Sequence, residues 1–92
     1  MKITFDPAKR TATLENRGLD FADAGKVFDG RTLDFPDDRC DYGEPRFICV
    51  GMLAGRMVIV VWTPRGEARR IISMRKANER EQARFGQRLG QG

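Results

Sequence analysis

The segment RMVIVVWTPRGEARRIISMR, residues 56–75, decides the fold of this 92-residue chain. It opens with the apolar run Met57 to Trp62, which is far too short to cross a bilayer and predicts an apolar strand. Proline, glycine and two charged residues follow at 64–67, a composition that favours a turn. The chain becomes apolar again after residue 70. The segment therefore predicts two neighbouring antiparallel strands, and four arginines lie in or beside the second one: Arg65, Arg69, Arg70 and Arg75.

The segments on either side of this pair complete a predicted α+β domain. Asp6-Pro7 provides an N-cap and a proline at the first helical position, and Asn78 with Glu81 has the spacing of a capping box. We expect strands at about 1–5, 31–35, 46–53, 56–63 and 68–75, and helices at about 7–17, 21–28 and 79–89. The order βααββββα predicts a single domain over residues 1–92, a small antiparallel β-sheet with its last strands in the centre and with helices packed on one face. The other face is then open for function.

Composition and charge narrow the class of protein. The chain is 40% hydrophobic and 33% charged, which is typical of a globular domain. No apolar stretch follows the N-terminal lysine, so we expect no signal peptide, no membrane association and a cytoplasmic location. Residues 65–92 hold eight Lys or Arg against three Asp or Glu, whereas residues 1–64 hold nine against ten. A basic end of this kind suits a phosphate backbone or an acidic protein partner.

Metal and cofactor chemistry is not expected. The chain has two cysteines, Cys40 and Cys49, and no histidine, and four-ligand zinc spacing is missing. Free reduced thiols are the simplest interpretation.

Four short motifs resemble one known family. They are DPAK at 6–9, GLDFADAGKVF at 18–28, DDRCDYGEPRF at 37–47, and RIISMRKAN at 70–78 followed by Glu81. In this order and spacing, over about residues 5–85, the chain resembles the BrnT toxins of bacterial type II toxin–antitoxin systems, whose fold is related to the RelE ribonucleases. The sequence departs from the family at Arg17, where histidine is usual, and at Phe85, where tyrosine is common.

The resemblance implies a function and partners. It implies a toxin that cleaves RNA and inhibits translation. A BrnA-type antitoxin would neutralise it in a hetero-oligomer and would supply the only contact with operator DNA. The positions that match kept family residues are Lys9, Arg65, Arg70, Ser73, Arg75 and Glu81.

RNA cleavage needs a base for the 2′-hydroxyl, stabilisation of the phosphorane and an acid for the leaving 5′-oxygen. Arginine is a poor proton donor but a good bidentate clamp for phosphate. Glu67 is the only carboxylate within the arginine cluster and is the candidate base, and Lys9 is the candidate acid or second clamp. The predicted catalytic set is Lys9, Arg65, Glu67, Arg70 and Arg75, and the predicted RNA-binding residues are Trp62, Arg69 and Ser73. No metal ligand and no cofactor are expected.

Each of these residues also has a structural interpretation. Arg65 and Glu67 suit an exposed turn, and Arg75 suits an ion pair with Asp6 or Glu81. Trp62 ends an apolar strand and suits the core, and Ser73 can satisfy backbone groups. Arg69 and Arg70 are strand neighbours, so at most one of them lies in the site, and the family match favours Arg70.

Three classes of function therefore compete. They are a metal-independent endoribonuclease toxin, a non-catalytic RNA-binding module of the same fold, and a protein-binding domain. Cleavage of labelled RNA with and without EDTA separates them.

Overall fold

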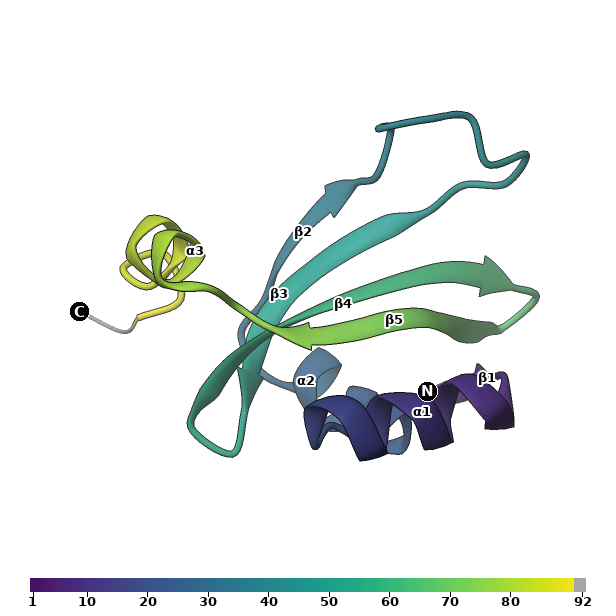
Figure 1. Ribbon diagram of the computed structural model, residues 1–92. Coiled ribbons are helices and arrows are strands. Elements are labelled where there is room, and N and C mark those ends of the chain that lie inside the picture. The colour runs from purple at the N-terminus through teal and green to yellow at the C-terminus, as the bar shows by residue number, and fades with distance from the viewer. Residues whose placement is uncertain (91–92) are drawn as a thin grey trace.

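The computed structural model describes residues 1–90, and residues 91–92 of the predicted domain lie outside that range. The elements are β1 (Lys2–Phe5), α1 (Pro7–Arg17), the 3₁₀ helix η1 (Phe21–Asp23), α2 (Ala24–Asp29), β2 (Leu33–Pro36), β3 (Phe47–Leu53), β4 (Arg56–Arg65), β5 (Ala68–Lys76) and α3 (Glu79–Phe85) (Figure 1). The α+β class and the order βααββββα are confirmed, with η1 as a short addition before α2. No helix within residues 1–90 is long and apolar enough to cross a membrane.

The five strands form one sheet in the order β1-β5-β4-β3-β2. The predicted antiparallel pairing of β3, β4 and β5 is confirmed, and β2 extends it. β1 instead pairs parallel with β5, over residues 68–71 only. The two strands of the segment 56–75 therefore lie inside the sheet, as predicted.

One face of the sheet is covered by α1, η1 and α2 (Figure 1). Phe21 and Val27 are buried there against Ile71 and Met74 of β5, so the predicted packing of the helix at 21–28 on the sheet is confirmed. Gly51 of β3 permits this close approach, because a Cβ at that position would lie 2.7 Å from a methyl group of Val27. This face forms the main core.

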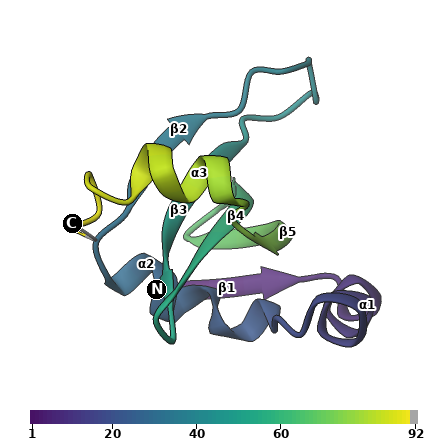
Figure 2. The same cartoon turned by 60° about the vertical axis from the view of Figure 1, so that its left-hand side comes forward.

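The prediction that all helices share one face is wrong for α3. Figure 2 shows α3 crossing the other side of the sheet in front of β3 and β4. Phe85 and the following Leu89 pack there against Val50, Met57 and Ile59. The sequence offers only a few apolar residues in this helix, and they are enough to hold it at one end of the second face.

The local signals at the helix ends are also confirmed. Asp6 accepts a hydrogen bond from the Ala8 amide (2.9 Å) and begins α1. Asn78 and Glu81 form the reciprocal capping box that begins α3, with N···O distances of 2.8 and 2.9 Å.

Candidate functional site

A β-bulge in β5 decides which side chains reach the face crossed by α3. Val61 and Trp62 are adjacent on β4, yet they pair with Ser73 and Ile71, so Ile72 has no partner on β4. Ile71 and Met74 point into the main core, whereas Ser73 and Arg75 point to the opposite face. Because bulges redirect side chains, one extra residue aligns polar groups on the open face.

A groove lies on that face, between the sheet, the loop after β2, and α3. Its volume is about 350 Å³, and its floor is apolar. The floor residues are Phe35, Ile48, Val50, Ile59 and Val61. The polar residues around the floor are Arg39, Ser73, Arg75, Glu81 and Arg84. We call this the arginine groove.

Arg75 is held by a two-point ion pair. Its guanidinium donates to both carboxylate oxygens of Glu81, over 2.7 and 2.8 Å, which confirms Glu81 as the partner considered for it from the sequence. The contact raises the pKa of Arg75 and lowers that of Glu81 to about 2. Glu81 is therefore a poor proton acceptor near neutral pH. A guanidinium carries five N–H donors, so Arg75 keeps donors for a ligand in the groove.

Arg39 and Arg84 are groove residues that the sequence did not indicate. Arg39 donates to both carboxylate oxygens of the buried Asp37, over 2.7 and 2.8 Å, and this hydrogen bonding lowers the pKa of Asp37. Arg84 projects from α3 and its guanidinium carbon lies 5.3 Å from the ring centre of Phe85. Arg39 lies in the motif at 37–47 but nothing there marked it as a site residue, and Arg84 offered only positive charge, because the placement of both depends on a loop and on the face that α3 covers.

A smaller pocket of about 230 Å³ lies beside the groove, between α1 and the bulge. Lys9, Thr13, Asn16 and Arg17 of the polar stripe on α1 line it, together with Ile72 and Ser73. Ser73 lines both hollows, so it lies between Lys9 in the smaller pocket and Arg75 in the arginine groove.

Arg17 has a structural task beside this pocket. β1 pairs with β5 only as far as Ile71, and the Arg17 guanidinium donates to the carbonyl oxygen of Met74 beyond that point (2.9 Å). The residue that stands where the family usually has histidine therefore satisfies a backbone group of β5.

The turn between β4 and β5 places two predicted catalytic residues elsewhere. Arg65 pairs with Glu44 (3.1 Å), and Glu67 is exposed in the turn. At about 3.3 Å per residue along a strand, Glu67 lies roughly 25 Å from Arg75. Arg70 lies between them, on the face of the groove by alternation along β5 but outside its lining. The structure does not bring the five predicted catalytic residues into one cluster.

Trp62 and Arg69 lie on the face of the main core. The Arg69 guanidinium carbon is 4.2 Å from the ring centre of Trp62 and 4.6 Å from that of Phe28. Phe47 flanks the same indole at a centroid distance of 5.0 Å. These contacts favour the structural interpretation of Trp62, because neighbours already occupy its ring surfaces.

The chemistry of the groove follows from this geometry. Three guanidinium groups, those of Arg39, Arg75 and Arg84, surround an apolar floor. One guanidinium group can bind two oxygens of a phosphate at once. An apolar floor can hold the ring of a base. Among residues 1–90, no three His, Cys, Asp or Glu side chains gather where they could hold a metal ion.

Comparison with known proteins identifies the family. The family described as "Ribonuclease toxin, BrnT, of type II toxin-antitoxin system" matches residues 5–81. The chain belongs to the BrnT family. The match includes Lys9, Ser73, Arg75 and Glu81, and Arg84 of this BrnT chain lies just beyond it. A type II toxin–antitoxin ribonuclease family implies an RNA substrate and an antitoxin partner. No curated protein matches the chain significantly.

Proposed function

We propose that this BrnT chain is a metal-independent endoribonuclease and that the arginine groove, with the adjoining Lys9 pocket, is its active site. The observation that carries the proposal is the ring of three guanidinium groups around an apolar floor, in a chain of a ribonuclease toxin family. A strand of RNA would place a phosphate between Arg39, Arg75 and Arg84 and a base over the floor.

The proposed reaction is attack of a ribose 2′-oxygen on the adjacent phosphorus. The bond from phosphorus to the 5′-oxygen breaks, so the products carry a 2′,3′-cyclic phosphate and a 5′-hydroxyl. Arg75 and its neighbours would stabilise the charge of the phosphorane, often the largest contribution to catalysis. Lys9 would protonate the leaving oxygen, and Ser73 would align the phosphate between the two hollows.

In the proposed mechanism the proton of the attacking 2′-hydroxyl passes to solvent water, and Lys9 regains from solvent the proton that it gives to the 5′-oxygen. Glu81 is unsuited as the proton acceptor because its pKa is about 2. Glu67, the base predicted from the sequence, lies in the turn outside the groove. We therefore propose that alignment and charge stabilisation supply most of the rate. On that basis Glu67→Gln should cleave RNA at a near-normal rate, and a large loss would restore Glu67 as the base.

Cleavage of end-labelled RNA by the purified protein tests the proposal. We expect cleavage in EDTA, products with cyclic phosphate ends, and no cleavage at a position that carries a 2′-deoxyribose. Cleavage that disappears in EDTA would contradict metal independence.

A second candidate is a non-catalytic RNA-binding module. It is favoured by the absence of histidine and by Phe85, which is buried against Phe35 (centroids 5.8 Å apart) and has no hydroxyl group to offer. Salt-sensitive retention of RNA without cleavage would support this alternative.

We also propose that the protein inhibits translation in the cytoplasm until a BrnA-type antitoxin forms a hetero-oligomer with it. Operator DNA would be contacted only through the antitoxin. Exposed cations are best covered by carboxylates, so we expect the antitoxin to cover some of the four cations predicted from the sequence, Lys9, Arg65, Arg70 and Arg75, and Arg75 in particular where it competes with RNA. Competition between antitoxin and RNA tests this, and full RNA access in a tight complex would contradict it.

A further inference from the structure

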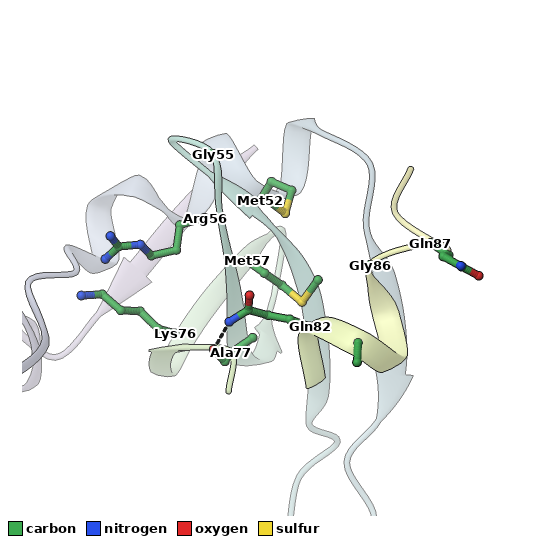
Figure 3. Close-up of a pocket in the computed structure, with 10 residues that line it drawn as sticks. Met52, Gly55, Arg56, Met57, Lys76, Ala77, Gln82, Gly86 and Gln87 are labelled. Carbon is green, nitrogen blue, oxygen red and sulfur yellow. Dashed lines mark hydrogen bonds between the residues drawn. The ribbon is translucent and has the colours of Figure 1, made fainter. Parts of the chain in front are cut away.

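A second and larger hollow lies at the end of the sheet, away from the arginine groove. It is bounded by the turn between β3 and β4, by the end of β5 and by α3, and its volume is about 690 Å³ (Figure 3). Ala54 and Gly55, both with positive φ, make the tight turn that closes this end of the hairpin. We call this hollow the hairpin groove.

One side of the hairpin groove carries two cations without carboxylate partners. Lys76 pairs with Val58 of the main core, and Arg56 lies two residues before Val58, so the two side chains are diagonal neighbours on the main-core face, where the groove passes around the end of the sheet. Figure 3 shows them extending in the same direction. Within residues 1–90, neither makes an ion pair. The positive charges of Arg56 and Lys76 repel each other at these neighbouring positions, so binding of an anion between them is favoured.

The other side of the hairpin groove is apolar and adaptable. Met52 and Met57 are cross-strand partners, and they pack on the face that α3 crosses. Methionine is flexible enough to adjust to a partner's shape. Ala83 of α3 and Gly86, which follows the helix, are small and leave room in the groove. The Gln82 amide of α3 donates to the Ala77 carbonyl oxygen (3.0 Å) (Figure 3).

The helix α3 separates the two grooves. Glu81, Arg84 and Phe85 line the arginine groove, whereas Gln82, Ala83 and Gly86 line the hairpin groove. A protein segment in the hairpin groove can therefore be bound without contact with the arginines proposed to bind RNA.

We propose that the hairpin groove is an anchoring site for the antitoxin, which deepens and rests on the function proposed above. The segment that binds there would pass around the end of the sheet. It would place a carboxylate between Arg56 and Lys76 and an apolar side chain against Met52 and Met57. The family implies a protein partner, the antitoxin. The positive charges of Arg56 and Lys76 favour an acidic segment of that partner, because opposite charges are complementary across an interface.

Two substitutions outside the catalytic surface test the proposal. Arg56→Glu reverses a groove charge, and Ala83→Trp fills the groove from an exposed helix position. Arg80→Glu is the matched control, because Arg80 is exposed on the same helix and lines neither groove. The dissociation constant of the purified BrnA-type antitoxin is measured by titration calorimetry, with RNA cleavage and thermal unfolding measured for each variant.

We expect antitoxin binding to weaken about tenfold or more for both groove variants and by less than about threefold for the control. RNA cleavage should stay at the parent level in all three. Equal antitoxin affinity in parent and groove variants would overturn the anchoring site while leaving the ribonuclease proposal intact. Loss of RNA binding in Arg56→Glu with unchanged antitoxin affinity would mean that the groove binds nucleic acid and would also overturn it. An antitoxin that does not bind the parent would overturn both the anchoring site and the proposed partner.

Discussion

The face of the sheet covered by α1, η1 and α2 differs from the face crossed by α3 in how completely it is buried. On the first, Phe21, Ile71 and Met74 are at most 1% exposed. On the second, α3 covers one end only, and Phe35 and Ile48 stay partly exposed on the floor of a groove. The first face contributes most of the folding free energy, and the second is left open for a ligand.

The same strand serves both faces, which shows how a small domain can combine a core with a binding surface. β5 sends Ile71 and Met74 into the core and sends Ser73 and Arg75 to the open face. The unpaired Ile72 makes this division possible.

The largest expected effect is on stability at the covered face. Phe21→Ala should lower the free energy of unfolding by about 3–5 kcal/mol, because a fully buried ring leaves a cavity. Ile48→Ala on the partly exposed floor should cost less than half as much. Urea denaturation of both variants measures the difference, and equal losses would mean that the open face is also a core.

The next effect concerns activity and separates the two ends of β5. Arg75→Ala should lower kcat/KM for RNA cleavage about a hundredfold or more, because it removes a donor from the proposed phosphate site. Arg65→Ala should change it by less than about threefold, since Arg65 pairs with Glu44 outside the groove. Steady-state cleavage assays provide the comparison. If Arg65→Ala were the more damaging change, the active site would lie at the turn between β4 and β5.

Acid should destabilise both faces, because each has a carboxylate whose pKa lies well below its usual value. Arg10 lowers the pKa of Asp20 from 3.8 to about 2, and Arg75 lowers that of Glu81 from 4.5 to about 2. A carboxylate whose folded-state pKa is depressed stabilises the protein above its unfolded-state pKa, and this contribution is lost as pH falls through the folded-state value. Stability should therefore decrease between about pH 4.5 and 2.

The two pairs can be told apart by substitution. Asp20→Asn and Glu81→Gln should each make the fall in stability with acid shallower, and glutamine keeps the capping-box hydrogen bond at position 81. Denaturation curves at a series of pH values measure the slope. An unchanged slope in both variants would show that other carboxylates cause the acid sensitivity.

The smallest expected effect is at the exposed turn. Arg65 and Glu44 form a surface pair with side chains 54% and 25% exposed. Arg65→Ala should change the free energy of unfolding by less than about 1 kcal/mol, because it leaves the pair of Glu44 with Arg46 in place. A loss as large as that of Phe21→Ala would show that this turn supports the fold.

The sequence predicted the elements of the fold more completely than it predicted which charged side chains lie together. Capping signals at Asp6 and Asn78, the apolar run in β4 and the order of elements were all readable, because they depend on neighbouring residues. The bulge at Ile72 was not, since one unpaired residue leaves no local signal. Without the bulge, simple alternation would not have placed Ser73 and Arg75 on the face of Arg70.

The remaining differences between the predicted site and the observed groove depend on contacts between residues that are far apart in the sequence. Arg39 and Arg84 join the site only because a loop and α3 meet over the sheet. Arg65 and Glu67 are close to Arg75 in sequence, but an extended strand carries them far from it. Trp62 and Arg69 face the main core because side chains alternate along a strand. The sequence predicted that Arg69 and Arg70 point to opposite faces, but alternation alone did not show which of the two faces the core.

The most direct test of the arginine groove is an NMR titration with a 2′-O-methyl RNA, which can bind but cannot supply the attacking hydroxyl. We expect the largest chemical-shift changes at Ser73, Arg75 and Arg84, on the face crossed by α3, and little change at Arg69 and Trp62. Changes confined to the turn at Arg65–Glu67, or to the face of the main core, would contradict it.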